Sequence, residues 1–167
     1  RPKRYTKDIA FPQAKSYSPS GFDLYQISAG EMMCTMEKLN SISEDSICQL
    51  VDAFYSKVRV DKELGPIFEA AIHDWPVHLE KMYAFWSSVM LTTGRYKGNP
   101  LIKHMVLPGI TPELFSQWLK LFDQTCNEMF DDDISAAFRV RAERIAESLK
   151  LGIFYRPDRP WPPQPVA

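Results

Sequence analysis

The chain has 167 residues, of which 45% are hydrophobic and 25% are charged, and its formal net charge at pH 7 is -1. This length supports one well-buried core, and this composition excludes an intrinsically disordered protein. The nearly balanced charge excludes a general electrostatic attraction to nucleic acid or to an anionic membrane, so neither is expected as a partner.

Cysteine usage and hydropathy indicate a protein of a reducing compartment. The three cysteines, Cys34, Cys48 and Cys126, are scattered and lack a CxxC spacing, which argues against a disulfide framework and a structural zinc site. No apolar run approaches the roughly 18 residues of a membrane span, and the N-terminal segment lacks the apolar core of a secretion signal. We therefore expect a cytoplasmic protein.

The two ends of the chain differ from its middle. Residues 1–40 show no sustained periodicity and contain three prolines, which predicts an irregular extension. Residues 156–167 hold five prolines in twelve residues, a composition that excludes a helix and predicts a solvated tail. Residues 41–155 form the predicted globular domain.

The first predicted helix begins just after residue 41. Ser41 or Ser43 can cap it, and Ser41 together with Glu44 matches a capping box. Its apolar residues, from Ile47 to Val58, recur with the spacing of one helix face.

Two further helical segments follow along the chain. Gly65 and Pro66 break the first pattern before a short segment of three apolar residues. A second long helix is expected from Asp74 to about Thr93. Pro76 does not exclude this start, because a proline is tolerated in the first turn of a helix. The apolar side of this helix comprises Leu79, Met82, Trp86, Val89 and Met90.

Two long helices complete the domain. Thr111 is the expected cap of one of them, and its inner face comprises Leu114, Phe115, Trp118, Leu121, Phe122, Thr125 and Met129. The acidic cluster at 131–133 suits the start of the next helix and Gly152 suits its end. Its expected buried stripe is Ile134, Ala137, Phe138, Ile145 and Leu149. Strand alternation is absent from the sequence, so the predicted fold class is all-α.

The connection 94–111 separates this chain from a simple four-helix bundle. It is too long for a bundle turn, and two prolines, Pro100 and Pro108, flank a short apolar segment that carries His104. A porphyrin iron needs one rigidly held imidazole with apolar cover. The same pattern also fits a histidine buried in the core, so the segment alone leaves both interpretations open.

Three other residues carry a polar side-chain group next to apolar residues of the predicted helices. His78 shares a helix face with Met82 and Trp86, where it can be a gate, a donor or a bystander. Tyr55 follows the stripe residue Phe54 and can lie at a boundary or point inward at a ligand. Trp118 lies among core residues, where a buried indole N–H still needs an acceptor.

Taken together, these segments resemble the group III truncated globins of bacteria. The residues that carry the resemblance are FYSKVR at 54–59, DKELGPIF at 61–68, His78 with Phe85-Trp86, GRYKGNPLIKH at 94–104 and FSQWLKLF at 115–122. The resemblance spans roughly residues 42–155 and leaves both ends outside. Group III also lacks the Gly-Gly pairs of the other truncated globins, as this chain does.

The resemblance implies a two-over-two helical sandwich that binds haem b. It makes His104 the proximal iron ligand and assigns Tyr55, His78 and Trp118 to the distal side. The residues expected to contact the haem are Phe68, Met82, Phe85, Leu101 and Lys103, and the candidates for the propionates are Arg95, Tyr96, Lys97, Lys103 and Arg141.

The function that follows is binding of dioxygen or another diatomic ligand by a monomer. An alternative is a haem peroxidase or a nitric-oxide dioxygenase, which would need a separate reductase because the chain carries no GxGxxG motif. A helical interaction module without haem is the alternative of another class. The sequence leaves open whether the protein is an enzyme.

Overall fold

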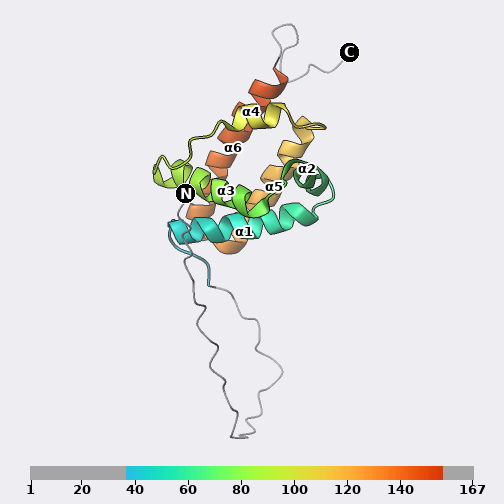
Figure 1. The fold of residues 1–167 in the computed structure, drawn as a ribbon. Helices are drawn as coiled ribbons and strands as arrows, with labels where there is room; N and C mark the ends of the chain where they lie inside the picture. Colours follow the sequence, from blue (N-terminus) through green and yellow to red (C-terminus); the bar gives the residue numbers. More distant parts are fainter. Residues whose placement is uncertain (1–36, 156–167) are drawn as a thin grey trace, which may run out of the picture. The chain divides into compact units, whose positions relative to one another are not determined.

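The structure, a computed structural model, describes residues 37–155, and the all-α prediction is confirmed there (Figure 1). Residues 1–36 of the expected irregular extension 1–40, with Cys34, and the proline-rich tail 156–167 lie outside the described residues. The helices are α1 (Glu44–Val60), α2 (Leu64–Ala71), α3 (Trp75–Leu91), α4 (Pro100–Met105), α5 (Pro112–Met129) and α6 (Asp132–Phe154). Within the described part, no helix is long and apolar enough to cross a membrane.

Helix α1 is capped by Ser43, and the predicted capping box of Ser41 and Glu44 is wrong. The Ser43 side chain accepts a hydrogen bond from the Ser46 amide, and the Ser46 hydroxyl accepts one from the Ser43 amide. The reciprocal pair therefore starts two residues later and uses a serine in place of the usual glutamate. This shift leaves the Glu44 side chain available for contacts outside α1.

The other helix ends follow the predicted pattern with one exception. Asp74 caps α3 by accepting a hydrogen bond from the Val77 amide, and Thr111 occupies the N-cap position of α5. The prediction that α6 ends at Gly152 is wrong, because the helix continues to Phe154. A Cβ at residue 152 would lie 2.6 Å from Leu101 Cδ1, so glycine here permits close packing of α4 on α6.

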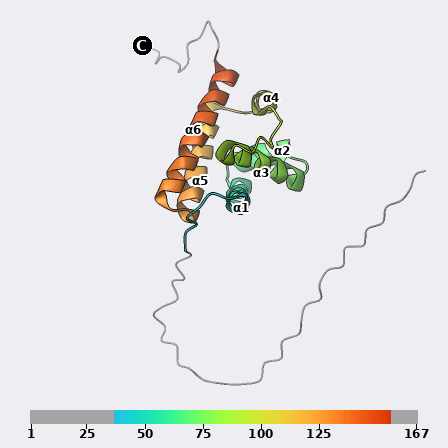
Figure 2. The same cartoon turned by 90° about the vertical axis from the view of Figure 1, so that its left-hand side faces the viewer.

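The long helices form two crossed pairs. Helix α3 packs on α1, α6 packs on α5, and α1 also packs on α5, which joins the two pairs. Figure 2 shows α5 and α6 as one layer with α1 and α3 beside it, and in Figure 1 α1 and α3 run across α5 and α6. The short helix α4 packs on α6, and α2 packs on α1, so the connecting segments occupy the flanks of the two pairs.

Aromatic rings fill the centre where the pairs cross. Phe122 of α5 is stacked between Trp86 of α3, at a centroid distance of 4.7 Å, and Trp118, at 5.1 Å. Phe54 of α1 meets Phe122 edge-on at 5.1 Å. Each fully buried large apolar side chain contributes about 1.5–3 kcal/mol, so this cluster is the main source of stability for the crossing.

The predicted buried stripe of α6 is partly wrong. Phe138 is buried as expected, but Ala137 is exposed. The small residues Ser135, Ala142 and Ala146 are buried, and the Ser135 hydroxyl donates to the Cys126 carbonyl of α5 at 2.9 Å. Small side chains allow the two helices to approach closely, so the buried face combines Phe138 with small residues that the apolar stripe did not include.

Candidate functional site

His104 lies on α4, and one of its two ring nitrogens already forms a hydrogen bond within the helix. Pro100 is the first residue of α4, and the Asn99 side chain caps the helix by accepting from the Ile102 amide at 3.3 Å. The His104 Nδ1 lies 2.8 Å from the Pro100 carbonyl oxygen. A carbonyl can only accept, so Nδ1 carries the proton and Nε2 keeps its lone pair. This is the tautomer that a metal-ligating histidine needs.

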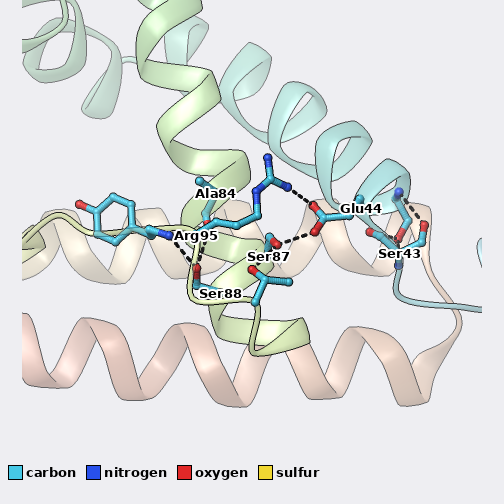
Figure 3. Close-up of polar contacts among 9 residues, drawn as sticks. Ser43, Glu44, Ala84, Ser87, Ser88 and Arg95 are labelled. Carbon is cyan, nitrogen blue, oxygen red and sulfur yellow. Dashed lines mark hydrogen bonds and ion pairs between the residues drawn. The ribbon is translucent and has the colours of Figure 1, made fainter.

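The loop that leads into α4 is held by side chains from α1 and α3 (Figure 3). The Glu44 carboxylate accepts from the Ser87 hydroxyl at 2.7 Å and from the Arg95 guanidinium at 2.8 Å. The Ser88 hydroxyl accepts from the Tyr96 amide at 2.9 Å. The hydrogen bond from Ser87 is the largest cause that lowers the pKa of Glu44, and Arg95 adds to it. The loop is thus tied to α1 and α3, which we call the first helix pair, before α4 begins.

Tyr55 and His78 are in contact. Their ring centroids are 5.2 Å apart at 85°, and Phe68 of α2 meets Tyr55 edge-on at 5.9 Å. Tyr55 is 5% exposed, and burial raises the pKa of its hydroxyl well above the ordinary value, so the hydroxyl remains a donor. Trp118 is not in ring contact with Tyr55; Phe54 lies between them and meets Trp118 at 5.1 Å.

His78 differs from His104 in its electrostatic environment. Its Nε2 is buried and has no hydrogen-bond partner among the described residues. Burial, together with the positive charges of Lys81 and His104, lowers the pKa of His78 to about 4. The ring is therefore neutral at physiological pH, with a polar nitrogen that no protein group satisfies. The third histidine, His73, is exposed.

The residues predicted to contact a haem fall on two apolar clusters. Phe68, Met82 and Phe85 are half-buried against the main core, whereas Leu101 packs with Phe115 in a second cluster next to α4. Lys103 is exposed on α4. Of the propionate candidates, Arg95 is already engaged by Glu44, whereas Lys97 and Arg141 are exposed.

The residues present fit an iron porphyrin. The described part of the chain contains no cluster of three or more His, Cys, Asp or Glu that could hold a bare metal ion. A porphyrin supplies four of the ligands itself and needs one imidazole from the protein, which His104 Nε2 can provide. The unpaired Nε2 of His78 is a second polar group suited to a ligand or a water molecule.

Three residues that contact this region, or the loop next to it, were not among the predicted site residues. Trp75 contacts both Tyr55, at 6.1 Å, and His78, at 5.8 Å. Its position three residues before His78 could have revealed it, because residues at that spacing share a helix face. Phe115 lies beside the His104 ring at 6.5 Å, and Glu44 holds the loop; no local pattern signals either contact.

Three comparisons with known proteins all match this chain to globins. The family model of bacterial-like globins matches residues 41–147. The chain is similar to the group 3 truncated hemoglobin ctb of Campylobacter jejuni, with 41% identity over 113 residues that cover 65% of this chain and 89% of the relative. A crystal structure of group III truncated hemoglobin from Campylobacter jejuni matches with a TM-score of 0.68 and 38% identity, covering 71% of this chain and 96% of that one. The predicted resemblance and the two-over-two fold are confirmed.

Proposed function

We propose that this chain, which belongs to the bacterial-like globin family, is a haem protein that binds dioxygen or another diatomic ligand. The cofactor we propose is haem b, whose ferrous iron supplies the bond to the ligand. A helical interaction module without haem is disfavoured by membership of this family. The residues of this chain would hold the haem and contact its ligand.

The observation that carries the proposal is the hydrogen bond of His104. Because Nδ1–H donates to the Pro100 carbonyl, the ring cannot rotate freely, and its Nε2 lone pair is preserved for iron. The adjacent Phe115 ring limits the access of water to this side. Leu101 extends the apolar cover, and Lys103 is exposed and long enough to pair with a propionate.

The polar groups of the other side are Tyr55, His78 and Trp118. A diatomic ligand that draws electron density outward is stabilised by donors near its outer atom. Tyr55 can donate because its hydroxyl stays protonated, and the Trp118 indole can only donate. Phe68, Met82 and Phe85 supply the apolar wall, which keeps such hydrogen bonds in a medium of low dielectric constant.

One spectrum tests this proposal. The purified protein, reconstituted with haem and reduced, should show a strong Soret band that shifts when carbon monoxide or dioxygen is added. His104→Ala should lose this stable, shifted species, whereas His73→Ala, which alters the exposed histidine of the α2–α3 connection, should retain it. A protein that takes up no haem, or two variants with the same spectrum, would contradict the assignment.

A further inference from the structure

Trp75 is one of the half-buried rings around Tyr55. It is half-buried, whereas Tyr55 beneath it is almost fully buried, and it contacts both Tyr55 and His78 edge-on. As the first residue of α3 it lies at the edge of the first helix pair, where α1 also packs on α2. A solvent molecule or small ligand approaching Tyr55 and His78 from this edge meets the Trp75 indole first.

The outer face of the indole is held by charged residues. The Arg59 guanidinium lies 4.7 Å from the Trp75 ring centroid, a distance at which a cation is attracted to the ring face. Arg59 Nε donates to Glu69 of α2 at 3.0 Å. The two charged side chains are each about half exposed, at 50% and 48%. Helices α1 and α2 therefore clamp a ring that belongs to α3, through contacts that water and salt can weaken.

Two unpaired nitrogens belong to the contacting rings of Trp75 and His78. Trp75 Nε1 and His78 Nε2 are both buried without a hydrogen-bond partner among the described residues. An unpaired buried polar group is costly, and its presence in a folded protein calls for an explanation. The contact between the two rings places both groups in one region, which is where a transient water or ligand would find polar partners.

We propose that Trp75, clamped by Arg59 and Glu69, is the access residue through which neutral diatomic ligands reach Tyr55 and His78. This inference rests on the proposed function. Opening requires the indole to leave its contacts with Tyr55 and His78 and to break the cation–π contact with Arg59. The barrier belongs to the protein and not to the ligand, so it applies equally to entry and to escape.

Binding kinetics test the proposal, because an access residue changes both rates alike. Trp75→Leu should raise the association and the dissociation rate constants of carbon monoxide by about the same factor, on the order of tenfold, which corresponds to a barrier about 1.4 kcal/mol lower. The dissociation constant should therefore stay the same. Arg59→Gln should have a smaller effect of the same kind. Val77→Ala, at an exposed position of the same turn, is the matched control and should keep both rates.

A second measurement uses the protein without haem. The indole N–H of Trp75, assigned in an ¹⁵N spectrum by its loss in Trp75→Phe, should exchange slowly with deuterium. Arg59→Gln should speed this exchange, and added salt should speed it in the natural sequence but not in Arg59→Gln. This readout keeps the proposal testable even where a variant binds haem poorly.

The possible outcomes distinguish a failure of the proposed haem function from a failure of the access role of Trp75. A natural sequence that binds no haem or diatomic ligand would overturn the proposed function itself. If it binds normally but Trp75→Leu leaves both rates unchanged, only the access role is overturned. A Trp75→Phe variant with a changed dissociation constant would also overturn that role, because the ring is kept and the indole N–H would then be a donor to the ligand.

Discussion

Tyr55→Phe isolates the contribution of one hydroxyl to ligand retention. The ring makes edge contacts with Phe54, Phe68, Trp75 and His78, and phenylalanine preserves all of them. Within the described part of the chain the hydroxyl forms no hydrogen bond, so its removal leaves no other group unpaired. The free energy of unfolding of the haem-free protein should therefore change by less than about 1 kcal/mol.

The effect on dioxygen should be much larger. A hydrogen bond to a strongly polarised acceptor contributes about 1.5–3 kcal/mol, which corresponds to about a 10- to 150-fold faster dissociation when it is lost. Trp118→Phe should act in the same direction, because it also replaces a donor with an apolar ring. The double variant should exceed either single one, by less than the sum if one donor compensates for the other.

Stopped-flow dissociation rates of the ferrous proteins measure this effect. Tyr83→Phe is the matched control, since its hydroxyl donates to Asp52 on the outer side of the first helix pair and the same atom is removed. That control should keep the dissociation rate of the natural sequence. Unchanged rates in both Tyr55→Phe and Trp118→Phe would refute the distal-donor argument, even for a protein that binds haem normally.

Four further changes test other parts of the argument. His104→Ala should abolish stable haem binding while far-ultraviolet circular dichroism stays helical, because it removes the only proposed protein–iron bond. His78→Leu should raise the association rate of carbon monoxide more than its dissociation rate, since a water held by the unpaired Nε2 would oppose entry alone, as flash photolysis can show. Gly65→Ala should lower the melting temperature, with a net cost of about 1–2 kcal/mol, because its Cβ would lie 2.9 Å from the Arg59 carbonyl oxygen. Removal of residues 156–167 should leave haem content and ligand affinity unchanged in absorbance titrations, because a proline-rich segment cannot extend α6.

Helix positions could be predicted from the sequence because their signals are local. Asp74 caps α3 by accepting a hydrogen bond from an amide three residues later, and such spacings are visible in any sequence. The error at Ser41 arose between two serines, each followed by a polar residue three positions on. Local patterns cannot decide between these, since the choice depends on Glu44 bonding to α3 and the loop.

The remaining errors share a tertiary cause. Gly152 resembled a helix end because glycine is common there, but its role is to admit Leu101 of α4. Ala137 fitted a stripe of apolar residues, but the packing of α6 buries Phe138 together with the small residues Ser135, Ala142 and Ala146. Trp75 was not among the predicted site residues, because only the fold brings Arg59 over its ring. Each error involves a contact between residues distant in sequence.

His104 and His78 show how the fold can prepare one residue type for two proposed roles. In His104, a backbone carbonyl one turn earlier accepts a hydrogen bond from Nδ1–H, which leaves Nε2 as the nitrogen available to a metal. In His78, burial and nearby positive charge lower the pKa to about 4, and Nε2 has no hydrogen-bond partner among the described residues. The ring of His104 is thus held by a backbone carbonyl, whereas the polar nitrogen of His78 is left for a water molecule or a ligand. We therefore expect His104 to hold the cofactor and His78 to act in the ligand-binding step.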